Sequence, residues 1–226
     1  MLSRKILPTN RQQVSRGIYK TADITSNFTS GSATLSNVSI GVPREGRLVA
    51  LYISGGLSAS TVVTSVTIAG VSATLAVQNS SQIRHNSIWY AQVSSGSTAQ
   101  ITITIGNTSS NQFAVTCVAL YEMASSTPVT NVNFTAGTAL APSSSVTITP
   151  PAGGLFFAGY SAGAIAAGTT ASWTNATEIS DFITISSTSI HTVAKDENLT
   201  ATPVTISATC TDASVNNKCI IVASWS

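Results

Sequence analysis

The sequence is poor in charged and chemically reactive side chains. Charged residues make up only 8% and aromatic residues only 6% of the 226 positions, and there are two histidines and three cysteines. The histidines, His85 and His191, stand near expected turns, with no cysteine or carboxylate at the spacing of a metal site or a catalytic triad. We expect both at the surface or at strand edges, in a protein that is not an enzyme and holds no metal or other cofactor.

Carboxylates are equally sparse and gather in one part of the chain only. Glu178, Asp181, Asp196 and Glu197 form the one acidic cluster in the sequence. Carboxylate oxygens could bind Ca²⁺, but the alternating Asp-x-Asp-x-Asn-Gly pattern of a calcium loop is missing. We expect these side chains to be solvated charges at turns.

The three cysteines, Cys117, Cys210 and Cys219, lack the spacing of a metal site. Cys210 and Cys219 fall on two successive expected strands, so a cross-strand disulfide and two separate thiols are both compatible with the sequence. Because an unpaired cysteine is commonly a small buried residue, we expect buried thiols.

Long hydrophobic runs are absent as well. The longest candidate, Leu155 to Gly168, is interrupted by glycines and a serine and is shorter than the roughly twenty residues that cross a bilayer. Residues 1–8 lack the continuous apolar core of a secretory signal. We expect a soluble protein with no membrane partner.

What the sequence does contain is typical of β-sheet. It is 43% hydrophobic, and its polarity comes from Ser, Thr and Asn, which suit strands joined by tight turns. Residues 101–105 alternate strictly between Ile and Thr, which predicts a strand with one buried face. Residues 48–53 and 115–121 are nearly continuous apolar runs, which predict central strands covered on both faces.

A repeated phrase indicates an internal duplication. A Pro-x-x-Gly turn, an apolar run and a closing glycine occur at residues 43–55 and again at 151–163. Further landmarks recur in the same order, which predicts two tandem domains of about a hundred residues each. The corresponding pairs are Pro43/Pro151, Gly46/Gly154 and Gly55/Gly163 at 108 positions, Ile68/Trp173 at 105, Ile101/Val204 at 103 and Tyr121/Trp225 at 104.

The expected organisation is an extended N-terminal arm over residues 1–20 and two domains over 21–124 and 125–226, with a linker near Met123 to Pro128. Many short antiparallel strands with regular turn signals predict an all-β protein built from two jelly-roll or immunoglobulin-like β-sandwiches. The expected strands lie near residues 24–29, 33–41, 46–54, 62–69, 71–78, 86–93, 98–106 and 112–122, and near 130–136, 143–149, 154–161, 170–174, 176–185, 188–194, 199–209 and 218–225.

The expected arm is basic and the rest of the chain is mildly acidic. Residues 1–20 carry five positive charges and no negative one, whereas eight acidic residues outnumber five basic ones in the remainder. Two interpretations stay open: an anchor that docks onto an acidic surface of a partner, and a solvated terminus with no partner. The candidate anchor residues are Arg4, Lys5, Arg11, Arg16 and Lys20.

Large aromatic residues could form a platform on which a sugar stacks. Trp173 takes the repeat position of Ile68, and Trp225 takes that of Tyr121, so we expect these two tryptophans in the cores. Trp89 and Tyr90 have no such explanation. They are the candidate glycan-binding residues.

The combined pattern resembles a family of virion-associated proteins of tailed phages and prophages. The resemblance covers nearly everything after residue 30 and implies a structural protein of the virus particle, such as a head decoration, head fibre or tail-associated protein. The stretches that carry it are Val66–Leu75, Ser87–Val93, Ser95–Ile105, Val118–Tyr121, Pro151–Gly154, Ser172–Glu178 and Val222–Trp225.

Three functions follow as hypotheses. The first is a non-enzymatic capsid decoration or head-fibre protein, located in the virion and anchored by its arm to the major capsid protein or another virion protein. The second is a receptor- or glycan-binding module that uses Trp89 and Tyr90 on a host surface. The third is a jelly-roll coat protein whose arm binds the genome, but five charges are few for that task, so nucleic acid is not an expected partner. Covering the sheet edges favours a homo-oligomer.

Overall fold

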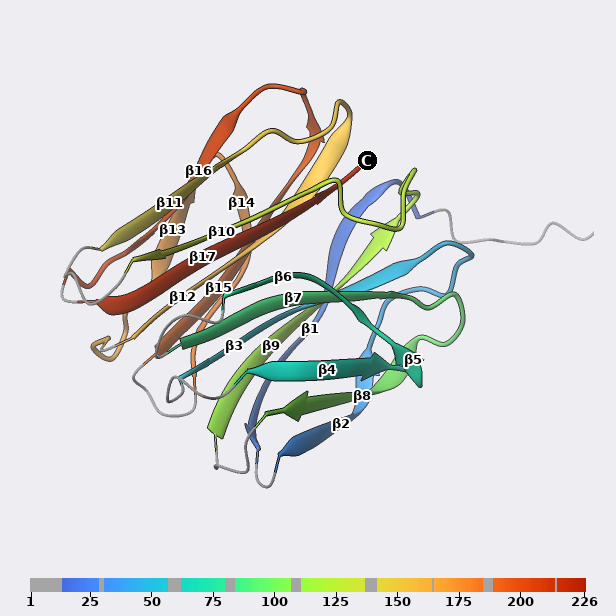
Figure 1. Cartoon of the computed structure of the whole chain (residues 1–226), viewed down its shortest axis with the longest axis horizontal. Coiled ribbons are helices and arrows are strands. Elements are labelled where there is room, and N and C mark those ends of the chain that lie inside the picture. Colours follow the sequence, from blue (N-terminus) through green and yellow to red (C-terminus); the bar gives the residue numbers. More distant parts are fainter. Residues whose placement is uncertain are drawn as a thin grey trace, which may run out of the picture.

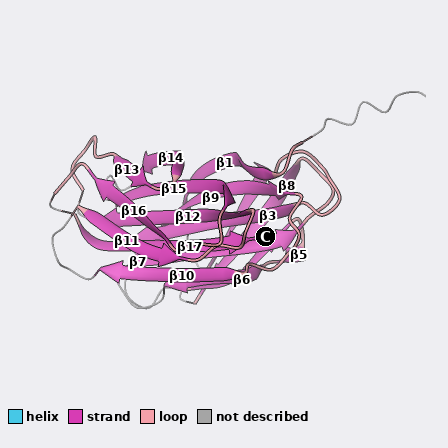
Figure 2. Ribbon diagram, turned by 90° about the horizontal axis from the view of Figure 1, so that it is seen from above, coloured by secondary structure: helices cyan, strands magenta, loops and turns pink. Residues whose placement is uncertain are grey.

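The computed structural model describes residues 14–28, 31–56, 62–79, 84–106, 111–136, 142–163, 165–184, 189–213 and 215–226. In these ranges the chain forms strands and loops (Figure 1). No helix long and apolar enough to cross a membrane occurs in the described ranges. Figure 2 shows the strands of both halves running along the long direction of the molecule.

The first half is a sandwich of two antiparallel sheets. The first inner sheet has the order β1-β9-β3-β7-β6, and the first outer sheet has the order β2-β8-β4-β5. The bounds are β1 (Gly17–Phe28), β2 (Ser32–Ser39), β3 (Leu48–Gly56), β4 (Val63–Ile68), β5 (Val71–Ser72), β6 (Thr74–Asn79), β7 (Arg84–Gln92), β8 (Thr98–Ile105) and β9 (Asn111–Tyr121).

The second half repeats this arrangement. The second inner sheet has the order β10-β17-β12-β15-β14, and the second outer sheet has the order β11-β16-β13. The bounds are β10 (Thr130–Ala136), β11 (Ser143–Ile148), β12 (Gly154–Gly163), β13 (Ala171–Thr174), β14 (Thr177–Ile183), β15 (Ser189–Leu199), β16 (Val204–Cys210) and β17 (Asn216–Trp225).

The order of the strands confirms the all-β sandwich prediction and distinguishes between its two versions. In each half the first four strands alternate between the inner and the outer sheet, and the last two do so again. That is the connectivity of a jelly roll, because an immunoglobulin-like sandwich places its first two strands in one sheet. The two halves have the same topology strand for strand apart from the short β5, as a duplication requires.

The four sheets stack in layers with three hydrophobic cores between them (Figure 1). The first core fills the first sandwich and includes Ile103, and the third fills the second sandwich and includes Phe156. The middle core lies between the two inner sheets and includes Phe157 and Trp225. The inner strands β3 and β12 are therefore covered on both faces, which confirms the prediction of central strands.

The inner sheets meet through their central strands and along one side. Strand β3 contacts β15 of the other half, and β12 contacts β7, which is the same pair of contacts with the halves exchanged. Strands β3 and β12 also contact each other. Strand β17 also contacts β6 and β7, and β10 contacts β6, so the second half meets the first mainly along its β10–β17 side.

The structure corrects two boundaries and one equivalence. Strand β1 begins at Gly17, so residues 17–20, expected in the arm, pair with β9 instead. A single strand, β15, covers residues 189–199, and β16 begins only at Val204. Leu48 pairs with Leu120, and Leu155 pairs with Trp225, so Trp225 is the equivalent of Leu120 and not of Tyr121. A shift of one residue in a strand moves a side chain to the other face, which is why the distinction matters.

Candidate functional site

The N-terminal basic residues divide into two groups. Arg4, Lys5 and Arg11 lie outside the described residues. Arg16 donates from Nη1 to the carbonyl of Gly153 at 2.5 Å, and Lys20 pairs with Asp23 at 2.8 Å. These two side chains therefore have partners within the protein, and the anchoring role of the five residues stays a prediction.

The described part of the chain begins at the junction of the two halves. The backbone N–H of Ile18 donates to Glu197 Oε1 at 2.8 Å, and Lys195 Nζ donates to the carbonyl of Ile18 at 2.6 Å. Ile18 itself is fully buried in the middle core. The start of β1, which belongs to the first inner sheet, is thus held by β15 of the second.

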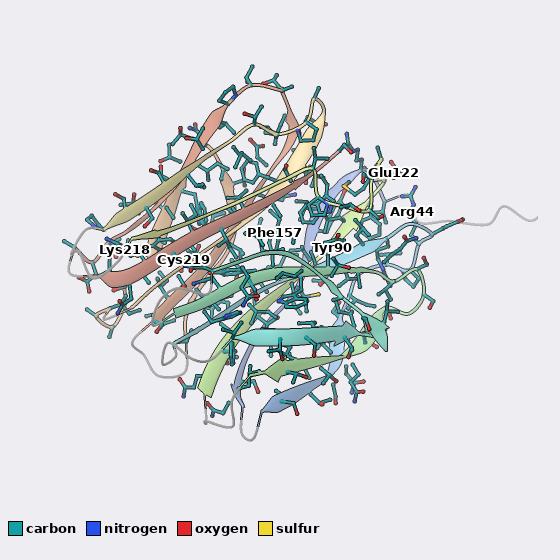
Figure 3. All side chains as sticks on the ribbon, in the orientation of Figure 1. Arg44, Tyr90, Glu122, Phe157, Lys218 and Cys219 are labelled. Carbon is teal, nitrogen blue, oxygen red and sulfur yellow. The ribbon has the colours of Figure 1, made fainter. Side chains whose placement is uncertain are left out.

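Further polar contacts tie the same end of the molecule together. Arg44 donates to the carbonyl of Val14 and pairs with Glu122, close to the end of β9. Figure 3 shows Arg44 and Glu122 side by side at this end. Ala124 N–H donates to the carbonyl of the last residue, Ser226, at 2.7 Å. We call this end, with residues 14–18, 44, 122–124, 153, 195–197 and 226, the junction end.

The two candidate sugar-binding aromatics are buried. Trp89 is 6% exposed within the first core, where its indole N–H donates to Ser87 Oγ at 3.0 Å. Tyr90 is 8% exposed within the middle core, where its ring meets the edge of Trp225. A sugar platform needs an exposed ring face, so burial contradicts the glycan-binding assignment of this pair. Trp225 is a core residue as expected, and Trp173 is half-buried against the third core.

The acidic cluster lies on strands and not in turns. Asp181 on β14 is half-buried and accepts the N–H of Ala171, and burial raises its pKa. Glu197 on β15 accepts the N–H of Ile18. The expectation of solvated charges is therefore wrong for these two residues, because each closes a backbone hydrogen bond. In the described ranges no three His, Cys, Asp or Glu residues are grouped so that they could hold a metal ion.

The three cysteines are free and buried, which agrees with the expectation of separate thiols. Each one lies in a different core: Cys117 in the first, Cys219 in the middle and Cys210 in the third. Burial raises the pKa of Cys117 to about 12.

Both histidines are buried, contrary to the expectation that they lie at the surface or at edges. His85 is 2% exposed and bonds Ser87 Oγ at 2.8 Å, with its ring edge-on to Phe113 of the first core. His191 is 0% exposed and faces the other half of the molecule. Burial lowers the pKa of each histidine to about 3.

A polar cluster surrounds His191 between the inner sheets. His191 Nδ1 lies 2.6 Å from Ser54 Oγ, and Nε2 lies 2.9 Å from Thr116 Oγ1. Thr116 Oγ1 in turn donates to Asp23 Oδ1 at 2.7 Å. The equivalent contact of the other half joins Ser161 Oγ to Asn86 Oδ1 at 2.8 Å.

The series Ser54, His191, Thr116 and Asp23 has the residue types of a proton relay but not its accessibility. Ser54 is 1% exposed and His191 and Thr116 are 0% exposed, so a substrate cannot reach the serine hydroxyl in the closed structure. The hydrogen bonds of this series join the two halves and leave each of these buried polar groups with a partner. Sequence reasoning missed this cluster because polar and apolar residues alternate along a strand in the same way whether its polar face is covered by the other half or exposed to solvent.

A shallow groove follows β1 and β2 along one side of the first sandwich. One hollow, of about 480 Å³, is lined by Val14, Tyr19, Val42 and Tyr121 among others. A second, of about 360 Å³, is lined by residues that include Ile24 and Leu35. Ser39 lines both, and Val14 places the start of the described chain at one end of the groove.

Comparisons with known proteins identify no family for this chain. No protein-family model and no curated protein matches the chain. Among solved structures, the chain resembles a chain of the Sputnik virophage, determined by cryo-EM, with 8% sequence identity, a TM-score of 0.20 and coverage of 100% of this chain and 90% of the other. At such a TM-score the resemblance carries no argument about function.

Proposed function

We propose that the chain is a non-enzymatic structural protein of a virus particle, a capsid decoration or head-fibre protein of a tailed phage. Residues 1–13 anchor it to the major capsid protein or another virion protein. The observation that carries the proposal is the junction end, where Arg16, Ile18 and Arg44 hold the start of the chain to both halves. A segment that is joined to the body at a fixed point can position the whole body on a partner.

The distribution of charge supports an electrostatic anchor. Residues 1–13 carry three positive charges, those of Arg4, Lys5 and Arg11, and no negative one. In residues 14–226, eight acidic residues and seven basic ones nearly cancel. The other two basic residues first considered for the anchor, Arg16 and Lys20, are bound within the fold. The anchoring segment therefore ends before them, and its partner is an acidic protein surface.

The body supports a display role. Two jelly rolls joined by the middle core form one stack, and the buried polar groups described above join strands and halves to one another. Repeated subunits on a particle surface need such a stable, charge-poor body more than they need a reactive site. A homo-oligomer that covers sheet edges belongs to the same proposal.

The test is rebinding to particles that lack this protein. Full-length protein is compared with a version that lacks residues 1–13 and with a triple variant, Arg4→Ser, Lys5→Ser and Arg11→Ser. Deletion must stop at residue 13, because removal of residues 14–20 would also take away part of β1 and the Ile18 contacts. Arg16→Ser, which alters a basic residue inside the fold, is the matched control.

We expect the full-length protein and Arg16→Ser to rebind, and the deletion and the triple variant to stay folded but unbound. Equal rebinding of all four proteins would show that a face of the body makes the contact. Salt-sensitive binding of the full-length protein to nucleic acid, absent from the triple variant, would favour the genome-binding alternative.

A further inference from the structure

His191 lies at the centre of the contact between the two halves. It belongs to β15 of the second inner sheet, while both hydrogen-bond partners of its ring, Ser54 on β3 and Thr116 on β9, belong to the first. The rings of Tyr52 and Phe182 flank it, with centroids 4.6 Å and 4.7 Å away. This imidazole therefore makes two hydrogen bonds across the contact between the halves.

The hydrogen-bond directions fix the state of the ring. Thr116 Oγ1 uses its only proton to donate to Asp23, so toward His191 it can only accept. Nε2 of His191 must therefore carry a proton, and Nδ1 then accepts from the hydroxyl of Ser54. The cluster is complete with a neutral imidazole. A second proton on Nδ1 would meet the proton of the Ser54 hydroxyl, which would have to turn away and accept from the ring instead of donating to it.

Few charges face the ring. The charged group of β1 nearest the ring is Asp23, which is separated from it by the hydroxyl of Thr116. Lys20 binds the other carboxylate oxygen of Asp23. From β3 the ionisable group is Tyr52, and β9 presents Thr116. The β14 residue that faces the ring is Phe182, whereas Asp181 of the same strand accepts a hydrogen bond from β13, in the second outer sheet.

The neighbouring strands of its own sheet add no charge next to the ring. On β12, Ser161 is paired opposite His191 and bonds Asn86 of the first half. On β17, Cys219 is paired opposite Ser161 and accepts a hydrogen bond from Asn79, also of the first half. Among the described residues, Asp23 is therefore the group that would compensate a positive charge on His191, and the Thr116 hydroxyl lies between the two.

We propose that the contact between the two sandwiches is acid-sensitive: protonation of His191 at Nδ1 disrupts the hydrogen bond that Ser54 donates to it, leaves a buried positive charge between the halves and lets the inner sheets separate. Each sandwich keeps its own core in the open state, because the first and third cores lie on the far faces of the inner sheets. On β15, Ile190 belongs to the third core, whereas Val193, on the same face as His191, belongs to the middle core. Opening exposes two apolar sheet faces that were built to fit each other.

The direction of the effect follows from burial. Burial lowers the pKa of His191 to about 3 in the closed state, and the exposed ring of the open state has a pKa of about 6.5. Stability of the closed state is therefore complete above pH 6.5 and is lost as pH falls toward 3. Each pH unit in that window shifts the equilibrium toward the open state by up to about tenfold.

The three cysteines provide a reporter for each core. We would label native full-length protein with 4,4′-dithiodipyridine between pH 7.5 and 4.5, above the titration range of most carboxylates, and locate the labelled residue by mass spectrometry. Rates at each pH are divided by those of the denatured protein, which removes the intrinsic pH dependence of the thiols. The proposal expects labelling of Cys219 to rise by up to about tenfold per pH unit, while Cys117 and Cys210 stay protected.

Two matched variants separate His191 from the other histidine. His191→Asn keeps a side chain that can bond Ser54, as Asn86 bonds Ser161, and should abolish the pH dependence of Cys219 labelling. His85→Asn changes a buried histidine of the first core and should leave that dependence in place. A Cys219 profile that is flat in the unchanged protein, or that is unaltered by His191→Asn, would overturn the proposal.

The proposal does not depend on either variant being well folded. In the unchanged protein, the ring protons of His191 can be followed by NMR over the same pH range, and the proposal requires that the ring gain its proton as Cys219 becomes reactive. Equal labelling of all three cysteines would indicate global acid unfolding instead of separation, and would also overturn it.

Discussion

At the scale of single residues, the contact between the halves depends on an absent side chain. Gly159 on β12 faces the ring of Tyr52, and a Cβ atom at position 159 would lie 2.3 Å from two of its ring carbons. Tyr52 cannot easily move away, because it is fully buried and its hydroxyl donates to Asn86. Only glycine allows the two central strands to approach this closely.

We therefore predict that Gly159→Ala destabilises the protein by roughly 1–3 kcal/mol, as overpacking of a core does. The measurement is the midpoint of urea unfolding. Gly106→Ala is the control, because the nearest atom to its added Cβ, Thr64 Cγ2, is at an ordinary 3.5 Å. Equal midpoints for the two variants would mean that the inner sheets can shift apart at no cost.

Arg47 is the second residue with a large expected effect. It is fully buried and donates four hydrogen bonds, to the carbonyls of Gly41, Val93, Ser95 and Gly96, at 2.7–2.9 Å. Its guanidinium thus holds together two loops at the junction end. The planar guanidinium carries several N–H donors in a fixed geometry, which no other side chain offers to these four carbonyls.

Arg47→Met should cost at least about 3 kcal/mol of unfolding free energy, because the buried carbonyls would lose their donors. Arg44→Met should cost less than about 1 kcal/mol, because the ion pair of Arg44 with Glu122 is partly exposed. Chemical denaturation of both variants measures the contrast. A small loss for Arg47→Met would mean that water can replace the guanidinium.

At the scale of elements, β1 differs most from expectation. Residues 17–20 pair with residues 121–118 of β9 and then pass a bulge before residue 22. The bulge interrupts the alternation, and the two charged side chains Lys20 and Asp23 bond each other on the exposed side. A short segment with spaced charges and no clear period resembles a loose arm in sequence, although its backbone completes a sheet.

The attachment of β1 to the second half can be tested at one amide. Glu197→Ala removes the acceptor of the Ile18 N–H and should speed hydrogen exchange of that amide by about tenfold, equivalent to the loss of about 1 kcal/mol. Glu197→Gln keeps an acceptor oxygen and should have a smaller effect. If the amide exchanges equally fast in both variants, its protection comes from the packing of Ile18 in the middle core and not from this hydrogen bond.

At the scale of the whole molecule, the sequence predicted the strands whose residues follow a clear periodic pattern. It did not predict which strand faces are covered by the other half of the molecule. The central strands, the alternating β8 and the duplication could be predicted because each has a pattern in the sequence. His191, Thr116 and Tyr90 could not be placed, because a face that packs on another sheet carries polar residues much as a wet face does. The proline and glycine landmarks are also 108 positions apart, whereas the structurally equivalent residues Leu48 and Leu155 are 107 apart, so an alignment on the landmarks is wrong by one residue within the strands.

The middle core makes the two sandwiches one folding unit near neutral pH. It holds 17 of the described buried residues, compared with 19 in the first core and 13 in the third. An interface of that size should make the halves unfold together. In urea at pH 7.5, Cys117 of the first core and Cys210 of the third should therefore become reactive at the same concentration.

Two neighbouring phenylalanines can test this coupling, because they point to opposite faces of β12. Phe157 is in the middle core and Phe156 is in the third, and both are fully buried. Each substitution by alanine should cost about 3–5 kcal/mol, but only Phe157→Ala weakens the contact between the halves. Cys117 and Cys210 should become reactive together in Phe156→Ala and at separate urea concentrations in Phe157→Ala. Separate transitions already in the unchanged protein would show that the sandwiches fold independently and that the middle core contributes little to their stability.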